Sequence, residues 1–110
     1  MQKLNSVKGT KDIFGKTVLE HDHVIKTFRD ICVFNNFKKI STPILEHENI
    51  FIKTLGVTSD IISKEMYNFK DQGGDNLVLR PEGTAAIVRA LITNSLQEDA
   101  NKNFYYHGPM

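Results

Sequence analysis

The spacing of apolar positions predicts a long amphipathic helix near the start of the chain. Between residues 17 and 34, apolar side chains recur at intervals of three and four, which is typical of a helix with one apolar face. The stripe consists of Val24, Ile25, Phe28, Ile31 and Cys32. Thr17 and Glu20 have the spacing of a capping box, and Asn35-Asn36 suits a helix end because asparagine tolerates positive φ. Residues 1–15 are expected to form an extended arm.

The rest of the chain alternates strand-like and helical segments. The expected elements are a strand at 37–42 ending at Pro43, a helix at 47–55 ending at Gly56, strands at 65–69 and 76–79, a helix from 85 to about 96, a polar loop at 99–103 and a strand from 104. Residues 71–75, Asp-Gln-Gly-Gly-Asp, predict a hairpin turn. In the helix that starts at residue 85, the positions expected to face the core are Ile87, Val88, Leu91 and Ile92.

Composition is typical of a globular domain of modest size. The chain has 110 residues, of which 40% are hydrophobic and 25% charged. A net charge of +1 predicts no basic face for direct nucleic-acid binding, so RNA is expected only as a partner of a larger protein. The single cysteine, Cys32, favours a cytoplasmic setting and is expected to be buried. No stretch approaches the roughly 18 apolar residues of a membrane span, and the N-terminus lacks the apolar core of a secretory signal.

Histidine and glycine patterns predict neither a metal site nor a phosphate loop. His21 and His23 flank Asp22, but positions i and i+2 point to different faces of a helix. The other two histidines are distant in sequence. Gly9-Thr10-Lys11 lacks the glycine spacing of a phosphate-binding loop. We therefore expect no metal ligands in this chain.

The clearest candidate chemistry lies in the turn after the strand at 76–79. Glu82 and Thr84 flank Gly83 at the point where a helix is expected to start. One interpretation is that the carboxylate and the hydroxyl bind the ammonium group of a small ligand, which Gly83 allows to come close. The other is that these residues only cap the helix. The turn by itself fits both interpretations.

Taken in order, several segments resemble the histidine–tRNA ligase family of class II aminoacyl-tRNA synthetases. They are Gly9-Thr10-Lys11-Asp12-Ile13, residues 35–46 with Pro43 (class II motif 1), Lys64-Glu65-Met66-Tyr67-Asn68-Phe69, Leu79-Arg80-Pro81-Glu82-Gly83-Thr84-Ala85 and Tyr106-His107-Gly108-Pro109-Met110. The resemblance implies an α+β fold in which helices flank a largely antiparallel sheet, here incomplete. It makes residues 1–110 an N-terminal fragment of the catalytic domain. Its parts are an arm at 1–15, a motif 1 region at about 17–46, a histidine-binding turn at 79–85 and a strand leading to motif 2 at 104–110. Gly15 departs from the family, whose arm usually has a proline there.

The resemblance also implies a function for the parent protein. Such an enzyme activates L-histidine with ATP and Mg²⁺ and transfers it to tRNA(His), acting as a cytoplasmic homodimer without membrane association. Glu82 and Thr84 would hold the histidine α-ammonium, Gly83 would leave room for it, and Pro43 would lie at the dimer interface. Motif 2, motif 3 and the anticodon-binding domain of the family are not in this chain. We therefore expect no catalytic residue within it, no tight ATP or Mg²⁺ binding, and no activity of the isolated 110 residues.

Two other interpretations remain open. One is the histidine-sensing regulatory subunit of ATP phosphoribosyltransferase, a group that usually carries Arg-X-Asp-X-Thr where this chain has residues 80–84, Arg-Pro-Glu-Gly-Thr. The other is a non-catalytic dimerisation or interaction module. The chain stops at Met110 within an apolar, aromatic strand, and an unpaired apolar edge invites aggregation. This ending predicts a truncated domain rather than a complete module.

Overall fold

The first compact unit, Met1–Asn35, consists of the arm and one helix. The computed structural model describes residues 3–98 and 103–110, and within this unit it has an irregular arm followed by α1 (Lys16–Phe34). The helix ends nearly where it was predicted to end, and Asn36 has the expected positive φ of 64°. The predicted capping box is wrong, because the helix already begins at Lys16 and no side chain caps it. Glu20 instead forms an exposed ion pair with Lys16, at 3.8 Å.

The apolar stripe of α1 lies on the surface of this chain. Every residue of the helix is described and none is buried. Val24 is 66% exposed and Ile31 58% exposed, whereas Cys32, expected to be buried, is intermediate. On another face, Lys26 donates a 2.7 Å hydrogen bond to Asp30, and this bond lowers the pKa of the Asp30 carboxyl.

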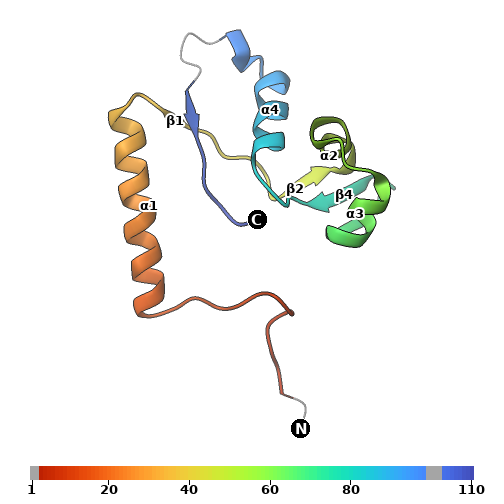
Figure 1. The fold of residues 1–110 in the computed structure, drawn as a ribbon, viewed down its shortest axis with the longest axis horizontal. Helices are drawn as coiled ribbons and strands as arrows, with labels where there is room; N and C mark the ends of the chain where they lie inside the picture. The colour runs from red at the N-terminus through yellow and green to blue at the C-terminus, as the bar shows by residue number, and fades with distance from the viewer. Residues whose placement is uncertain (1–2, 99–102) are drawn as a thin grey trace. The chain divides into compact units, whose positions relative to one another are not determined.

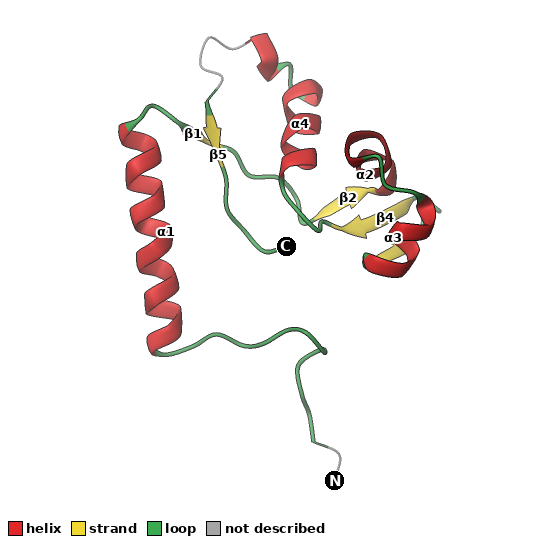
Figure 2. Ribbon diagram, in the orientation of Figure 1, coloured by secondary structure: helices red, strands yellow, loops and turns green. Residues whose placement is uncertain are grey.

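The second unit, Asn36–Met110, contains a three-stranded antiparallel sheet. Its strand order is β2 (Leu45–His47), β4 (Asn76–Leu79) and β3 (Asn68–Lys70), drawn in yellow in Figure 2. The predicted hairpin joins β3 to β4: the Asp71 carboxylate accepts a 2.8 Å hydrogen bond from the Asp75 amide, and Gly74 has a φ of 89°. The antiparallel sheet is therefore confirmed.

A short parallel pair completes the strands of this unit. The strands β1 (Lys38–Lys39) and β5 (Phe104–Tyr105) pair in parallel, with Lys38 opposite Phe104. The strand predicted over residues 37–42 is thus much shorter, although its pairing extends to Ile40, whose amide donates to the Tyr105 carbonyl at 3.0 Å. Residues 99–102 of the predicted polar loop lie outside the described residues.

Helices pack on the antiparallel sheet and close a small core (Figure 1). They are α2 (Glu48–Leu55), α3 (Ser59–Glu65) and α4 (Thr84–Thr93), whereas the 3₁₀-helix η1 (Leu96–Glu98) contacts α4. As predicted, Gly56 ends α2 in the left-handed conformation, with a φ of 68°. The sequence did not predict α3. Because this helix extends to Glu65, β3 begins at Asn68 and not at residue 65 as predicted. The core cluster comprises Phe51, Ile62, Val78 and Ala85.

The buried face of α4 differs from the predicted one. Val88 is 41% exposed and Ile92 is 65% exposed, so the expectation that they face the core is wrong. The buried positions are instead Ala85, Ala86 and Ala90. Small side chains let the helix backbone approach α2 and the sheet closely, and this close packing decides which face turns inward.

Candidate functional site

The carboxylate of Glu82 caps the start of α4. The Thr84 amide donates a 2.6 Å hydrogen bond to Glu82 Oε2, and the Ala85 amide donates a 3.0 Å hydrogen bond to Oε1. These bonds satisfy two amides that a helix N-terminus leaves without intrahelical partners. Glu82 therefore caps α4, and the binding of an ammonium group by the same carboxylate stays a prediction.

Capping leaves Glu82 able to bind a cation as well. A carboxylate offers about four acceptor positions, and the two amides occupy one on each oxygen. The two amides hold the carboxylate in a fixed position. Because Glu82 is only half-buried, solvent or a ligand can still reach it. The positive end of the α4 dipole favours the negative charge there. The result is an oriented carboxylate with spare acceptor capacity.

Thr84 lies beside this carboxylate and contacts a residue from a distant part of the chain. Its Oγ1 is 3.1 Å from the hydroxyl of Tyr106, and either group can donate. Tyr106 directly follows β5, so the site combines the turn after β4 with the segment after β5. From the sequence, Tyr106 was expected only to lie in a strand from residue 104 and in a segment that resembles the family. An aromatic side chain next to a short apolar strand was the available signal, but the pairing with residue 84 depends on the tertiary fold.

Gly83 makes room for the ring of Tyr106. A Cβ at this position would overlap Cε2 of Tyr106 and lie 2.9 Å from its Cζ. The φ of Gly83 is −104°, which any residue adopts, so the backbone conformation does not require glycine here. In this structure the space directly over Gly83 holds the Tyr106 ring, and the expected role of Gly83 toward a ligand stays a prediction.

The buried side chain of Arg80 ties the turn to two other segments. Its Nε donates to the Pro109 carbonyl at 3.0 Å, and its Nη1 donates to the Thr42 carbonyl and hydroxyl at 3.2 and 3.0 Å. Arg80 is only 7% exposed. A Cβ on Gly108 would lie 2.7 Å from Nη2, so the absence of a side chain there accommodates the guanidinium. Arg80 thus holds the strand end that carries Glu82 and Thr84.

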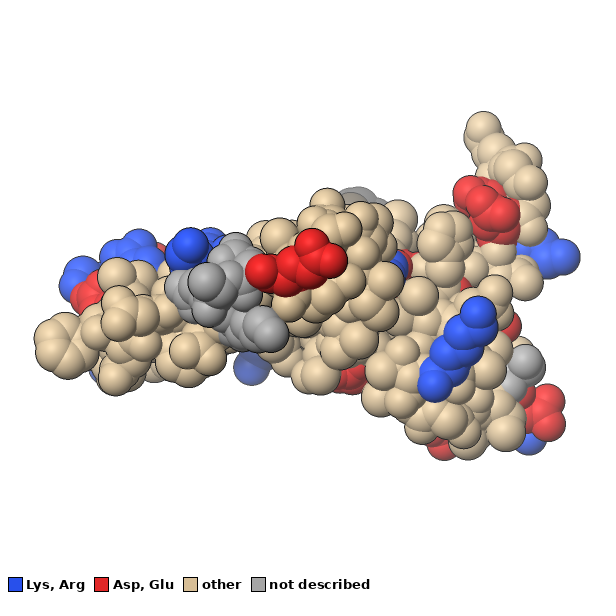
Figure 3. Space-filling model, turned by 90° about the horizontal axis from the view of Figure 1, so that it is seen from above, with Lys and Arg blue, Asp and Glu red and all other residues tan. Residues whose placement is uncertain are grey.

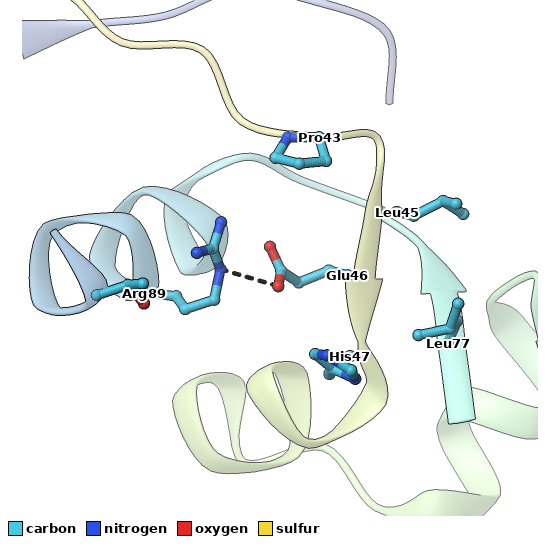
Figure 4. Close-up of a pocket in the computed structure, with 7 residues that line it drawn as sticks. Pro43, Leu45, Glu46, His47, Leu77 and Arg89 are labelled. Carbon is cyan, nitrogen blue, oxygen red and sulfur yellow. Dashed lines mark ion pairs between the residues drawn. The ribbon is translucent and has the colours of Figure 1, made fainter. Parts of the chain in front are cut away.

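A cavity of about 410 Å³ lies between β2 and α4 (Figure 4). Its lining residues are Pro43, Leu45, Glu46, His47, Leu77, Arg89 and Thr93. Glu46 reaches from β2 toward α4, and its Oε1 lies 2.9 Å from Nε of Arg89. The distance is that of an ion pair but the angle is not that of a hydrogen bond, and Glu46 Oε2 has no hydrogen-bond partner among the described residues. Pro43 lies at this cavity, apart from the residues that Glu82 and Thr84 contact.

Neither a metal site nor a membrane segment is found in the described part of the chain. Among residues 3–98 and 103–110, no three histidine, cysteine, aspartate or glutamate side chains are grouped to hold a metal ion. None of the described helices combines the length and the apolar character needed to cross a membrane. On the face drawn in Figure 3, basic and acidic side chains lie scattered among uncharged ones.

Comparison with known proteins relates nearly the whole chain to a single family. The family model described as histidyl-tRNA synthetase matches residues 9–110. The chain is 48% identical over 110 residues to a histidine–tRNA ligase of Gluconacetobacter diazotrophicus and 44% identical over 109 residues to that of Thermotoga maritima. It spans about a quarter of the length of these relatives, 26% in each case.

Solved structures of similar proteins share the fold. The apo histidyl-tRNA synthetase of Staphylococcus aureus superposes with a TM-score of 0.81 at 34% identity, covering 98% of this chain and 25% of that one. A Bacillus halodurans protein named as an ATP phosphoribosyltransferase regulatory subunit/histidyl-tRNA synthetase superposes with a TM-score of 0.75 at 26% identity, covering 98% and 27%. The mixed helix-and-strand architecture matches the expected class II fold in incomplete form.

Proposed function

Because this chain belongs to the histidyl-tRNA synthetase family, we propose that it is the N-terminal part of a histidine–tRNA ligase. In the complete enzyme, the carboxylate of L-histidine would attack the α-phosphate of ATP to form histidyl-adenylate and release pyrophosphate, and the histidyl group would then pass to tRNA(His) with release of AMP. The observation that carries this proposal beyond the family is the fixed Glu82 carboxylate beside the Thr84 hydroxyl.

The histidine α-ammonium is the group that this turn would bind. Glu82 supplies the opposite charge and Thr84 a hydroxyl acceptor, while the Glu82 carboxylate is already oriented by the two amides that it caps. A hydrogen bond of this charge-assisted kind contributes about 1.5–3 kcal/mol. An amide nitrogen in a peptide lacks the charge, so the turn would select a free amino acid.

The remaining steps depend on parts of the family that this chain lacks. ATP would supply the adenylyl group, and Mg²⁺ would neutralise the phosphate charge. Among the described residues, no group of three or more potential metal ligands is found, so we assign no residue of this chain to Mg²⁺. With the ammonium contact alone, the isolated chain should bind histidine at millimolar concentration or weaker, about −4 kcal/mol. We therefore propose that residues 1–110 alone do not form the adenylate.

A cytoplasmic homodimer is the assembly that we propose for the complete protein. Motif 1 builds the dimer interface in the family that the sequence resembles, and Pro43 lies within that motif here. The exposed apolar stripe of α1, with Val24 66% and Ile31 58% exposed, is consistent with burial in a larger assembly. The absence of a spanning helix among those described is compatible with a protein that acts without a membrane.

The test is histidine-dependent exchange of pyrophosphate into ATP by the complete gene product. We expect an open reading frame that continues past codon 110 into an Arg-X-Glu-Arg-Pro-Gln-like run, and a purified product whose exchange requires histidine. The 110-residue chain, assayed in parallel, should show only background exchange. A stop codon directly after Met110, or a long product without histidine-dependent exchange, would contradict the proposal.

A regulatory subunit of ATP phosphoribosyltransferase is the second candidate, which the Bacillus halodurans structure brings into consideration. Such a protein would bind histidine without charging tRNA. The glutamate at position 82 favours the ligase, because the regulatory group usually has aspartate in this turn. A complete product that binds histidine but neither exchanges pyrophosphate nor aminoacylates tRNA would favour this candidate.

A further inference from the structure

The contact between Tyr106 and the turn is built into the fold from both sides. On one side, Gly83 is buried and has no Cβ, which is the only arrangement that leaves space for the Tyr106 ring. On the other side, Tyr105 is fixed by the parallel pairing of β5 with β1 and by the Ile40 amide. Tyr106 therefore presents its hydroxyl at a defined place, 3.1 Å from Thr84 Oγ1.

The Tyr106 hydroxyl can determine how the Thr84 hydroxyl faces a bound cation. A threonine hydroxyl has one proton and two lone pairs, whereas an ammonium group brings donors only. If the hydroxyl proton of Thr84 faced the ammonium group, the two positively charged ends would repel each other. The Tyr106 oxygen can accept that proton, which turns the Thr84 lone pairs toward the space beside the Glu82 carboxylate.

We propose that Tyr106 is a positioning residue for the α-ammonium of the amino-acid substrate. It acts through Thr84, by accepting the threonine proton and fixing the hydroxyl as an acceptor next to Glu82. This inference rests on the proposed function, since it concerns the same site. It assigns Tyr106 to recognition of the ammonium, and not to recognition of the imidazole or the carboxylate.

The substitution Tyr106→Phe separates this role from simple packing. Phenylalanine keeps the ring that fills the space over Gly83 and removes only the hydroxyl, so the protein should stay folded, with a melting temperature lowered only slightly by the loss of one exposed hydrogen bond. The measurement is calorimetric binding to the full-length protein with three probes. L-histidine and histidinol both carry the ammonium, whereas 3-(imidazol-4-yl)propionate lacks it.

We expect Y106F to raise the Kd of histidine and of histidinol by about 5- to 10-fold, as for loss of one hydrogen-bond partner. The Kd of the propionate should be the same for both proteins. Thr84→Val should weaken histidine binding similarly, and Y106F added to T84V should cause little further loss, because Tyr106 acts through Thr84.

Two results would overturn the inference while leaving the proposed function intact. One is an unchanged histidine Kd in Y106F. The other is a loss that does not act through the ammonium contact at Thr84, seen either as an equal loss for all three probes or as full additivity with T84V. If the unsubstituted full-length protein binds no histidine, the proposed function fails first and this inference fails with it.

Discussion

Glu82 combines a structural and a proposed chemical role in one carboxylate. Its two oxygens receive the Thr84 and Ala85 amides, at 2.6 and 3.0 Å, and still have acceptor capacity. The helix start thereby orients the same group that would bind the substrate. A single substitution to alanine would therefore disturb both roles, and only a graded pair of substitutions separates them.

Glu82→Ala and Glu82→Gln should affect stability and binding differently. The alanine variant loses both capping bonds and should lower the free energy of unfolding by about 1 kcal/mol. Glutamine keeps one acceptor oxygen for a helix amide, so the free energy of unfolding of the E82Q variant should change less. Both lose the charge and should raise the histidine KM of the full-length enzyme by about 10- to 100-fold.

Urea unfolding followed by circular dichroism, together with pyrophosphate exchange, measures both effects. If E82Q keeps the wild-type histidine KM while E82A loses stability, Glu82 is only a cap and the proposed ammonium contact is wrong.

At the scale of single residues, the sequence could identify Glu82, Gly83 and Thr84 because they are adjacent. It could not identify the partners that come from elsewhere. Tyr106 is 22 positions from Thr84, and the Pro109 carbonyl is 29 positions from Arg80. Such contacts depend on how the strands pair, and the pattern of neighbouring residues in the sequence carries no information on that pairing. The ring that covers Gly83 could not be identified for the same reason, since Tyr106 belongs to the segment after β5.

At the scale of elements, one buried ion pair joins the strand β2 to the helix α4. The side chain of Glu46 is 5% exposed and that of Arg89 is 24% exposed, so the two charges are unequally shielded from water. Removing one partner of such a pair leaves the other charge without compensation. Because α4 begins at the candidate site, this pair also helps to fix the turn.

Arg89→Ala should therefore destabilise the chain by about 3–5 kcal/mol, since it leaves a buried carboxylate unpaired. Glu46→Ala should cost less, because water reaches part of Arg89. The double substitution to leucine and methionine, E46L/R89M, should recover much of the loss, since apolar replacements of a buried pair are often neutral. Urea unfolding of the four proteins provides the test, and equal costs of the two alanine variants would contradict this account.

The elements themselves were predictable where local signals were strong. The α1 periodicity, the Gly56 helix end and the Asp-Gln-Gly-Gly-Asp turn all act within a few residues, and the structure confirms them. The helix α3 was missed because its seven residues are too few to show a clear period. The prediction for the inward face of α4 was wrong because it placed the large apolar side chains in the core. Close packing instead buries the alanines of this helix.

At the scale of the whole molecule, the α1 stripe provides a test of the proposed homodimer. Val24 and Val33 lie nine positions apart, on opposite faces of the helix, and are 66% and 57% exposed. Val24→Glu places a charge in the apolar stripe, and Val33→Glu makes the same change outside it. Sedimentation of the full-length protein should show a weaker dimer for V24E, by about 10-fold or more in Kd, and an unchanged dimer for V33E. Equal behaviour of the two variants would exclude the stripe from the interface.

The parallel pairing of β1 with β5 has a consequence for synthesis on the ribosome. The antiparallel sheet can form once Leu79 has been synthesised. The pairing of Lys38 with Phe104 and the hydrogen bond from Arg80 to the Pro109 carbonyl can form only after those later residues have been added. At about 5–20 residues per second, this interval lasts on the order of seconds. Throughout it, the Gly83 backbone lacks the Tyr106 ring that later covers it. Within residues 1–110, the turn at 79–85 is thus among the last parts to mature, and the polypeptide made after the turn completes it.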